Sequence, residues 1–376
     1  MSYEERLEMY APISSARNRP LIVYVTSCRQ NASAQMGSDV ISQFAKVLSK
    51  ISTDKENIDI LIVSNGGDPI VSWRIICMLR EKFKKISVLL PWAAYSAATL
   101  LALGADEIIM HPFSNLGPVD PQLTTQRKIP SQPAGQNIET ISFGSEDIRY
   151  FLDFVKSDVG ISDQAQLQQS FELICKEVGS IPIGAAKRST QLSLSMSEKL
   201  LNLHIKDSSR AKTISETLNR SFYHHGYPVG LKEAKEIGLP VVAVDKGIED
   251  MIWAVWQDIE KEMECDKPFN PVELVLADPE VSALIEPVKQ IQIPANLPPQ
   301  VAQQLYNNLL QQIQFVEVPP IDYNLFQATL ECCWCKSEFR TKGKINAVRL
   351  PDMNLAVNVL PISAEWLFSE NSGAIK

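Results

Sequence analysis

The first 112 residues of the chain alternate short apolar runs with longer segments in which apolar positions recur at helical spacing. The apolar runs are "RPLIVYVTS", "IDILIVSNGGDP", "KISVLLP" and, after a third helical segment, "DEIIMHP". Strands that alternate with helices of about 10–15 residues are typical of parallel α/β folds. Nearly continuous apolar strands indicate a sheet that is covered on both faces. The pattern therefore predicts an α/β fold, a layered parallel sheet with helices.

The pattern changes twice in the second part of the chain. Residues 125–145 are rich in Pro, Gln, Ser and Thr and predict an exposed loop, after which helical periodicity dominates. After residue 266 the composition shifts to Pro, Gln and Asn, and then to alternating β-rich segments with a predicted hairpin about Gly343. We therefore expect one domain over 1–266. A Pro/Gln-rich linker and a small, mainly β C-terminal appendage are expected over 267–376.

Composition narrows the class of protein. With 376 residues, 45% of them hydrophobic, the chain can bury a sizeable core, and a net charge of −8 argues against nucleic-acid binding through overall charge. The N-terminus has no apolar run of signal-peptide type, and no segment reaches the ~18 apolar residues of a membrane span. Seven scattered cysteines then predict reduced thiols and a cytoplasmic location.

Two turns at the ends of successive strands contain candidate catalytic residues. In "SNGGDP", Gly66 and Gly67 permit positive φ and expose backbone N–H groups, and in "AYSAAT" Ser96 leaves a strand and opens a helix. Backbone donors at such turns can stabilise the oxyanion of a tetrahedral intermediate. Ser96 is therefore either a presented nucleophile or an ordinary helix-capping serine.

These residues resemble a known family. "IVSNGGDP", a serine 29 residues after Gly67, "GADEIIMHPFSNLGPVDPQL" and "FYHHGYPVGLKEAKEIGLPV" are similar to blocks of the serine dehydrogenase proteinase family. That family is related to signal peptide peptidase A and the Clp protease subunit. The resemblance covers about residues 20–265 and implies a Clp/crotonase-like fold, which extends the α/β prediction.

The resemblance also assigns roles. It implies that Ser96 is the nucleophile and that the N–H groups of Gly67 (or Gly66) and Ala97 form the oxyanion hole. In relatives the serine is often followed by glycine, or by alanine and then glycine, whereas Ala97 and a second alanine stand here.

The sequence does not identify a single general base. The histidine of the Clp subunit falls near Val119 or Asp120, so this chain cannot use the Clp Ser-His-Asp triad as it stands. The signal peptide peptidase branch uses a lysine whose pKa is lowered by burial. Lys156 is the best-placed lysine on an amphipathic segment, Lys187 is second, and Lys128 lies in the polar loop.

A histidine base is the other possibility. His225 matches the family's histidine and Asp120 matches the aspartate of "GPVDPQ", so His225 would act as base and Asp120 would orient it. Alternatively, Asp120 caps a turn and His225 holds the "YPVG" turn in place.

No metal site is predicted. Cys332, Cys333 and Cys335 have the form of half a zinc site, but no second Cys or His pair follows them. Buried or partner-facing thiols are the simpler interpretation.

The leading hypothesis is a cytosolic serine peptidase-like hydrolase that acts on a peptide or protein and needs no metal or organic cofactor. The family fold tends to oligomerise, so we expect a homo-oligomer with no membrane span. The alternatives are a catalytically weak or inactive oligomeric module for peptide binding or assembly, and an enzyme of the crotonase type acting on acyl-CoA.

Overall fold

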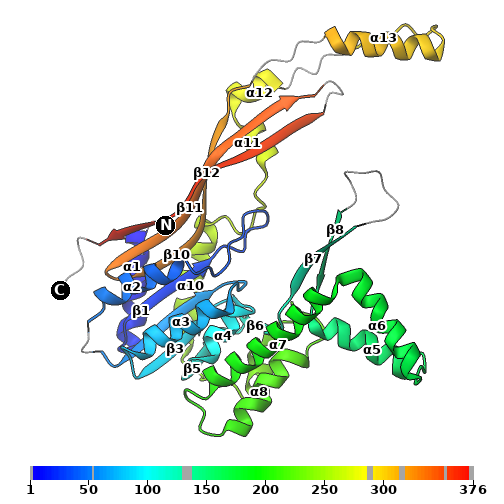
Figure 1. The fold of residues 1–376 in the computed structure, drawn as a ribbon. Helices are drawn as coiled ribbons and strands as arrows, with labels where there is room; N and C mark the ends of the chain where they lie inside the picture. Colours follow the sequence, from blue (N-terminus) through cyan, green and yellow to red (C-terminus); the bar gives the residue numbers. More distant parts are fainter. Residues whose placement is uncertain are drawn as a thin grey trace.

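The computed structural model describes residues 3–52, 55–128, 138–285, 291–312, 318–350 and 354–371. Its main feature is a seven-stranded sheet in the order β12-β11-β10-β1-β2-β3-β5 (Figure 1). The strands are β1 (Leu21–Thr26), β2 (Asn57–Val63), β3 (Lys85–Leu90), β4 (Ala93–Ala94), β5 (Glu107–Met110), β6 (Asn115–Leu116), β7 (Leu123–Lys128), β8 (Ile138–Phe143), β9 (Val229–Gly230), β10 (Ile321–Cys332), β11 (Cys335–Arg349) and β12 (Leu355–Glu370).

Helices cover this sheet on both faces. The helices of the described residues are α1 (Tyr3–Arg17), α2 (Val40–Lys50), α3 (Pro69–Arg80), α4 (Ala97–Leu103), α5 (Ser145–Ser157), α6 (Gln164–Val178), α7 (Ser180–Leu201), α8 (Ser208–Arg220), α9 (Leu231–Ile237), α10 (Lys246–Glu262), α11 (Pro271–Ala277), α12 (Pro279–Ile285) and α13 (Pro299–Gln312). Of these, α5, α6 and α13 lie away from the sheet (Figure 1).

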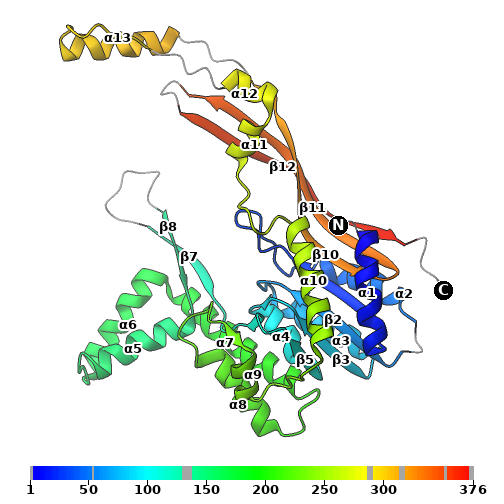
Figure 2. The same ribbon diagram turned by 180° about the vertical axis from the view of Figure 1, so that it is seen from behind.

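The layering follows from the apolar strands. β1, β2, β3 and β5 pair in parallel, and every residue of β1 is buried. Successive side chains of a strand point to opposite faces. Ile22 and Tyr24 accordingly pack in the core with α2, α3 and α4, whereas Val23 and Val25 pack in a second core with α1 and α10. Figure 2 shows α1 and α10 on the face opposite to α2 and α3. The predicted α/β layered architecture is confirmed.

The C-terminal strands extend the same sheet. β10 pairs antiparallel with β1, with Tyr24 opposite Leu330, so the composition change at residue 266 does not mark a break in the sheet. The mainly β C-terminal segment is confirmed, and the far ends of β11 and β12 project from the core as an arm that carries α11 and α12 (Figure 1).

The predicted hairpin about Gly343 is wrong. β10 turns into β11 at Cys333 and Trp334, and Gly343 lies inside β11 opposite Tyr323 and Pro361. A Cβ at Gly343 would lie 2.2 Å from the carbonyl oxygen of Leu360. Gly343 is thus required by close packing within the sheet, where glycine allows two strands to approach.

The loop predicted over 125–145 is partly wrong. β7 and β8 pair antiparallel, with Thr125 opposite Ile141 and Leu123 opposite Phe143. β-branched and aromatic residues favour strands, and they stand on both sides of the polar stretch.

Among the described residues, no helix combines the length and the apolar character that a membrane span requires.

Candidate active site

A small sheet brings the predicted site residues together. β4, β6 and β9 form a separate three-stranded sheet beside the main one. Ser96 follows β4, Asp120 follows β6, and His225 precedes β9. Ser64, in the glycine turn after β2, also forms a bridge to Ala94 of β4. Segments far apart in the sequence therefore meet at one place because of this pairing.

Ser96 lies at the N-cap position of α4 but does not act as a cap. Its backbone has φ 51° and ψ −114°, and its side chain makes no capping hydrogen bond. Within the described part of the chain, no hydrogen bond to its hydroxyl is found, and the residue is half-buried. A non-glycine residue in such a conformation is strained by roughly 1–3 kcal/mol, and such strain clusters at functional sites. The structure therefore disfavours the helix-capping alternative.

The glycine turn has no room for side chains. Gly66 has φ 97°, and a Cβ there would lie 2.8 Å from the Cβ of Ser96. Gly67 has φ 149°, and a Cβ there would lie 2.5 Å from the carbonyl oxygen of Met36. Both glycines are needed for the turn to approach Ser96 on one side and Met36 on the other.

The backbone N–H groups of this turn differ in availability. The N–H of Gly66 donates to Ser64 Oγ at 3.1 Å. The N–H groups of Gly67 and Ala97 have no acceptor among the described residues. The sequence does not decide whether Gly66 or Gly67 supplies the N–H group of the oxyanion hole. In the structure, Gly67 is the one of the two whose N–H group is free among the described residues.

Ser96, Gly67 and His225 line one cleft of about 370 Å³. The other lining residues come from α3, α4, α7, β7 and loops: Gln35, Asn65, Pro69, Leu100, Val119, Pro121, Gln122, Leu123, Ser189, Leu192 and Ser193. The wall on the α7 side is fixed because Ser193 Oγ donates to the carbonyl oxygen of Val119 at 2.6 Å. The cleft combines apolar residues with convergent polar groups, as ligand sites do.

His225 and Asp120 form a hydrogen-bonded pair at this cleft. His225 Nδ1 donates to Asp120 Oδ1 at 2.8 Å, and Gln122 Nε2 donates to Asp120 Oδ2 at 2.9 Å. The hydrogen bond to Asp120 raises the pKa of His225 above its ordinary value, and burial opposes this shift. Since the carboxylate only accepts, the ring proton lies on Nδ1, and Nε2 of the neutral ring keeps its lone pair.

Two of these contacts are not predicted from the amino-acid sequence. Gln122 holds Asp120 from the second side, and Ser64 occupies the N–H of Gly66. Gln122 stands in the "GPVDPQ" motif, so its proximity to Asp120 was the available signal. The partner of Gly66 has no comparable signal, because it depends on the geometry of the turn.

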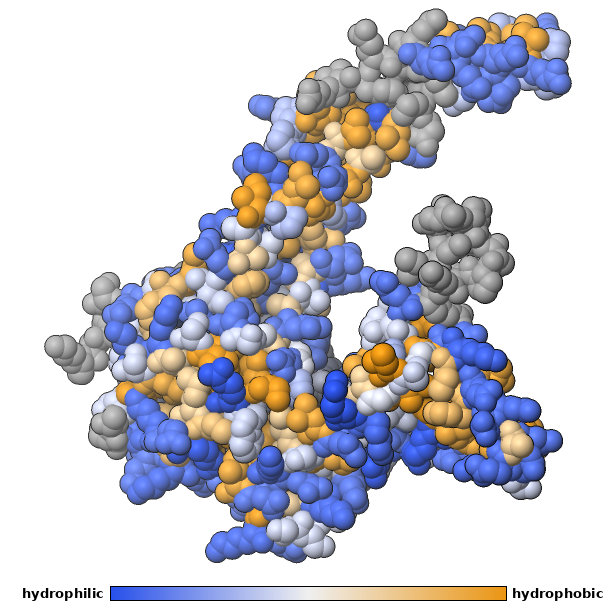
Figure 3. Space-filling view, viewed as in Figure 1, coloured by the Kyte–Doolittle hydropathy of each residue, from blue (hydrophilic) through white to orange (hydrophobic). Residues whose placement is uncertain are grey.

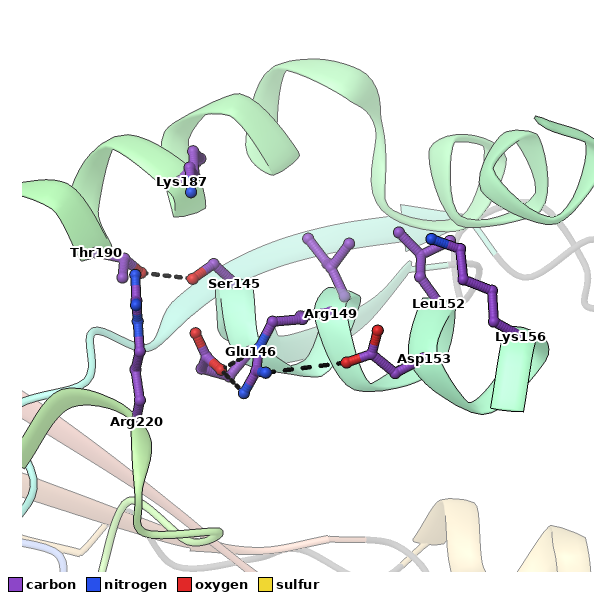
Figure 4. A pocket seen from close by; sticks show the side chains of 10 residues that line it. Ser145, Glu146, Arg149, Leu152, Asp153, Lys156, Lys187, Thr190 and Arg220 are labelled. Carbon is purple, nitrogen blue, oxygen red and sulfur yellow. Dashed lines mark hydrogen bonds and ion pairs between the residues drawn. The ribbon is translucent and has the colours of Figure 1, made fainter. Parts of the chain in front are cut away.

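The structure does not bring the candidate lysines into this cleft. Lys156 of α5 and Lys187 of α7 are exposed and line a second pocket of about 460 Å³ (Figure 4). That pocket also contains Arg149, which pairs with Glu146. Lys128 ends β7, and its side chain lies outside the described residues.

No metal-binding cluster accompanies the site in the described residues, where no three His, Cys, Asp or Glu side chains are grouped to hold an ion. The candidate chemistry therefore consists of a serine hydroxyl, a histidine–carboxylate pair and free backbone N–H groups.

Solved structures give only weak overall similarity. A serine-to-alanine mutant of the 1510-N membrane-bound stomatin-specific protease is 18% identical, with a TM-score of 0.33, over 57% of this chain and 77% of that one. ClpP1 from Listeria monocytogenes is 13% identical, with a TM-score of 0.30, over 65% of this chain and 98% of that one.

Sequence comparison identifies two similar proteins and one matching family model. Two uncharacterized proteins of Methanocaldococcus jannaschii, MJ0137 and MJ1495, are 28% and 27% identical over 244 and 247 residues. Each match covers 63% of this chain, and the matches cover 73% and 71% of the two relatives. Residues 6–139, which include Ser96, Gly67 and Asp120 but not His225, match the model of the ClpP-like SDH-type serine proteinases. The resemblance predicted from the motifs is therefore confirmed over residues 6–139.

Proposed function

We propose that the chain is a serine peptidase in which Ser96 is the nucleophile and His225 is the general base. One observation carries this proposal. A strained serine whose hydroxyl has no hydrogen-bond partner among the described residues lines the same cleft as a histidine held by a carboxylate. The family of residues 6–139 supports the same reaction class.

The proposed reaction is acyl transfer through Ser96. Ser96 Oγ attacks the carbonyl carbon of a peptide bond while Nε2 of His225 accepts the hydroxyl proton. The oxyanion that forms accepts hydrogen bonds from the N–H groups of Gly67 and Ala97. His225 then donates its proton to the leaving amine, and water hydrolyses the acyl-enzyme with the same base. Asp120 keeps the imidazole in the required tautomer and stabilises its charged form. This sequence of steps requires no metal or organic cofactor.

Substitution of the candidate bases distinguishes a histidine from a lysine mechanism. We expect His225→Ala to lower kcat/KM for a fluorogenic protein substrate such as labelled casein by roughly 10²–10⁴-fold. Lys156→Ala and Lys187→Ala are matched controls, because both side chains are exposed and outside the cleft, and they should leave kcat/KM unchanged. Equal losses in a lysine variant, with unchanged unfolding curves, would instead support a serine–lysine dyad.

The pH dependence follows from the His225–Asp120 pair. A general base must be unprotonated, so activity should fall as the pH drops through the pKa of His225, which lies above its ordinary value. Asp120→Asn removes the carboxylate that favours the charged ring. The acidic limb of the kcat/KM profile should therefore move to lower pH in Asp120→Asn, together with a loss of rate. An acidic limb at the same pH in both proteins would exclude His225 as the titrating base.

A non-catalytic binding or assembly module is the second candidate. The observation in its favour is that no hydrogen bond joins Ser96 to His225 in the described residues, although such bonds often tighten only when substrate binds. Apolar residues exposed along the arm, including Val348 and Ile362, suit contacts with further copies of the chain (Figure 3). Peptide binding that Ser96→Ala leaves unchanged, without hydrolysis by the parent protein, would favour this candidate.

A further inference from the structure

The turn between β10 and β11 places two thiols against each other. Cys332 and Cys335 are directly opposite residues of the two strands, and their sulfur atoms are 3.5 Å apart. Both residues are fully buried, and Cys333 and Trp334 form the turn between them. Opposite residues of an antiparallel pair have Cα atoms about 4.5–5.5 Å apart, which lies within the range that a disulfide spans. Bond formation requires the sulfur atoms to close to about 2.05 Å.

Neighbouring segments hold the turn in this geometry. The hydroxyl of Tyr3 donates to the carbonyl oxygen of Cys332 at 2.6 Å. On the other side, the backbone N–H of Asn371 donates to Trp334 at 2.8 Å, and Asn371 Nδ2 donates to the carbonyl oxygen of Cys333 at 3.2 Å. Since α1 and the end of β12 both fix the turn, the two thiols stay opposite each other without a covalent bond.

The two thiols are not equivalent. The hydrogen bond from Cys335 lowers the pKa of Cys332, and the same bond raises the pKa of Cys335 well above its ordinary value. The thiolate is the reactive form of cysteine, so Cys332 is the thiol that reacts first. Cys333 and Trp334 line a pocket of about 420 Å³, so solvent reaches the turn, whereas the sulfur atoms of Cys332 and Cys335 are buried behind it.

We propose that Cys332 and Cys335 are a redox-active dithiol, which hydrogen peroxide converts into a reversible disulfide across the β10–β11 turn. The thiolate of Cys332 attacks one peroxide oxygen, so that an S–O bond forms, the O–O bond breaks, and the released hydroxide takes up a proton to give water. The sulfur of Cys335 then attacks the sulfenic acid, so that the S–S bond forms and the S–O bond breaks. The proton of Cys335 and the released hydroxide give the second water. Two electrons pass from the sulfur atoms to the peroxide.

Peptide mapping of the full chain tests this proposal. The protein is treated with hydrogen peroxide, free thiols are blocked with iodoacetamide, and the digest is analysed without reduction. We expect a disulfide between Cys332 and Cys335 with a blocked thiol at Cys333, and we expect dithiothreitol to restore all three thiols. Blocked thiols at both Cys332 and Cys335 after this treatment, or a bond that uses Cys333, would overturn the proposal.

Two variants provide matched controls. Cys333→Ser removes the thiol of the turn and should leave the disulfide intact, since the opposed sulfur atoms are unchanged. Cys335→Ser should abolish the disulfide and leave Cys332 to be blocked directly or trapped as sulfenic acid by dimedone. Loss of the bond in Cys333→Ser would contradict direct oxidation of the opposed pair, because Cys333 would then be required as a relay.

Discussion

Ser96→Ala is expected to lower the hydrolysis rate by roughly 10⁴- to 10⁶-fold, the range found when the nucleophile of a serine hydrolase is removed. The hydroxyl of Ser96 has no hydrogen-bond partner in the described residues, so its removal leaves no buried group unsatisfied. The unfolding free energy of Ser96→Ala should therefore match that of the parent. The measurement is kcat with labelled casein together with urea unfolding of both proteins.

Ser96→Gly is the matched variant for the backbone. Glycine adopts positive φ without strain, so this variant should be as inactive as Ser96→Ala and about 1 kcal/mol more stable. A gain in stability on loss of activity would mean that the conformation of Ser96 serves the reaction and not the fold. Substantial hydrolysis by either variant would contradict a nucleophilic role.

Glu331→Gln is expected to lower the unfolding free energy by about 3–5 kcal/mol, because it breaks a buried ion pair and takes the carboxylate acceptor away from buried donors of Arg6 and Tyr10. Arg6 of α1 and Glu331 of β10 are both fully buried, with Arg6 Nη2 and Glu331 Oε1 2.6 Å apart. Tyr10 donates to Glu331 at 2.6 Å, and Arg6 also pairs with Asp258 of α10 at 3.1 Å. The network joins the first helix, α10 and the C-terminal strands in one core.

Lys84→Ala is the control for this stability prediction. Lys84 pairs with Glu56, but 76% and 63% of the two side chains are exposed, and exposed pairs contribute about 0–1 kcal/mol. Urea unfolding should therefore separate Glu331→Gln clearly from Lys84→Ala. Similar midpoints for the two variants would contradict the role of Glu331 as a link between the C-terminal strands and the core.

The parallel part of the fold was predictable from sequence because its strands are nearly all apolar. The sequence did not predict that β10 would join β1, since this pairing depends on contacts between residues such as Leu330 and Tyr24 that lie far apart in the chain. The position of the C-terminal hairpin was missed because Gly343 is typical of a turn. In the structure, its lack of a side chain serves strand packing instead.

Only the part of the candidate site that depends on local sequence could be predicted. Local sequence identifies Ser96 and Gly67, because both stand at strand ends in a recognisable motif. The pairing of His225 with Asp120, which are 105 positions apart, could only be a hypothesis until β9 and β6 were seen to pair. Lys156 suited the periodicity of an amphipathic helix, but periodicity does not specify which cleft a helix borders.

Labelling with a fluorophosphonate tests the proposed nucleophile most directly, because the reagent phosphonylates a serine only when its hydroxyl is activated. Mass mapping of the labelled, folded protein should place one adduct on Ser96, with a labelling rate that falls in His225→Ala and is unchanged in Lys156→Ala. A folded protein that carries no adduct on Ser96 under conditions that label a known serine hydrolase would contradict the account.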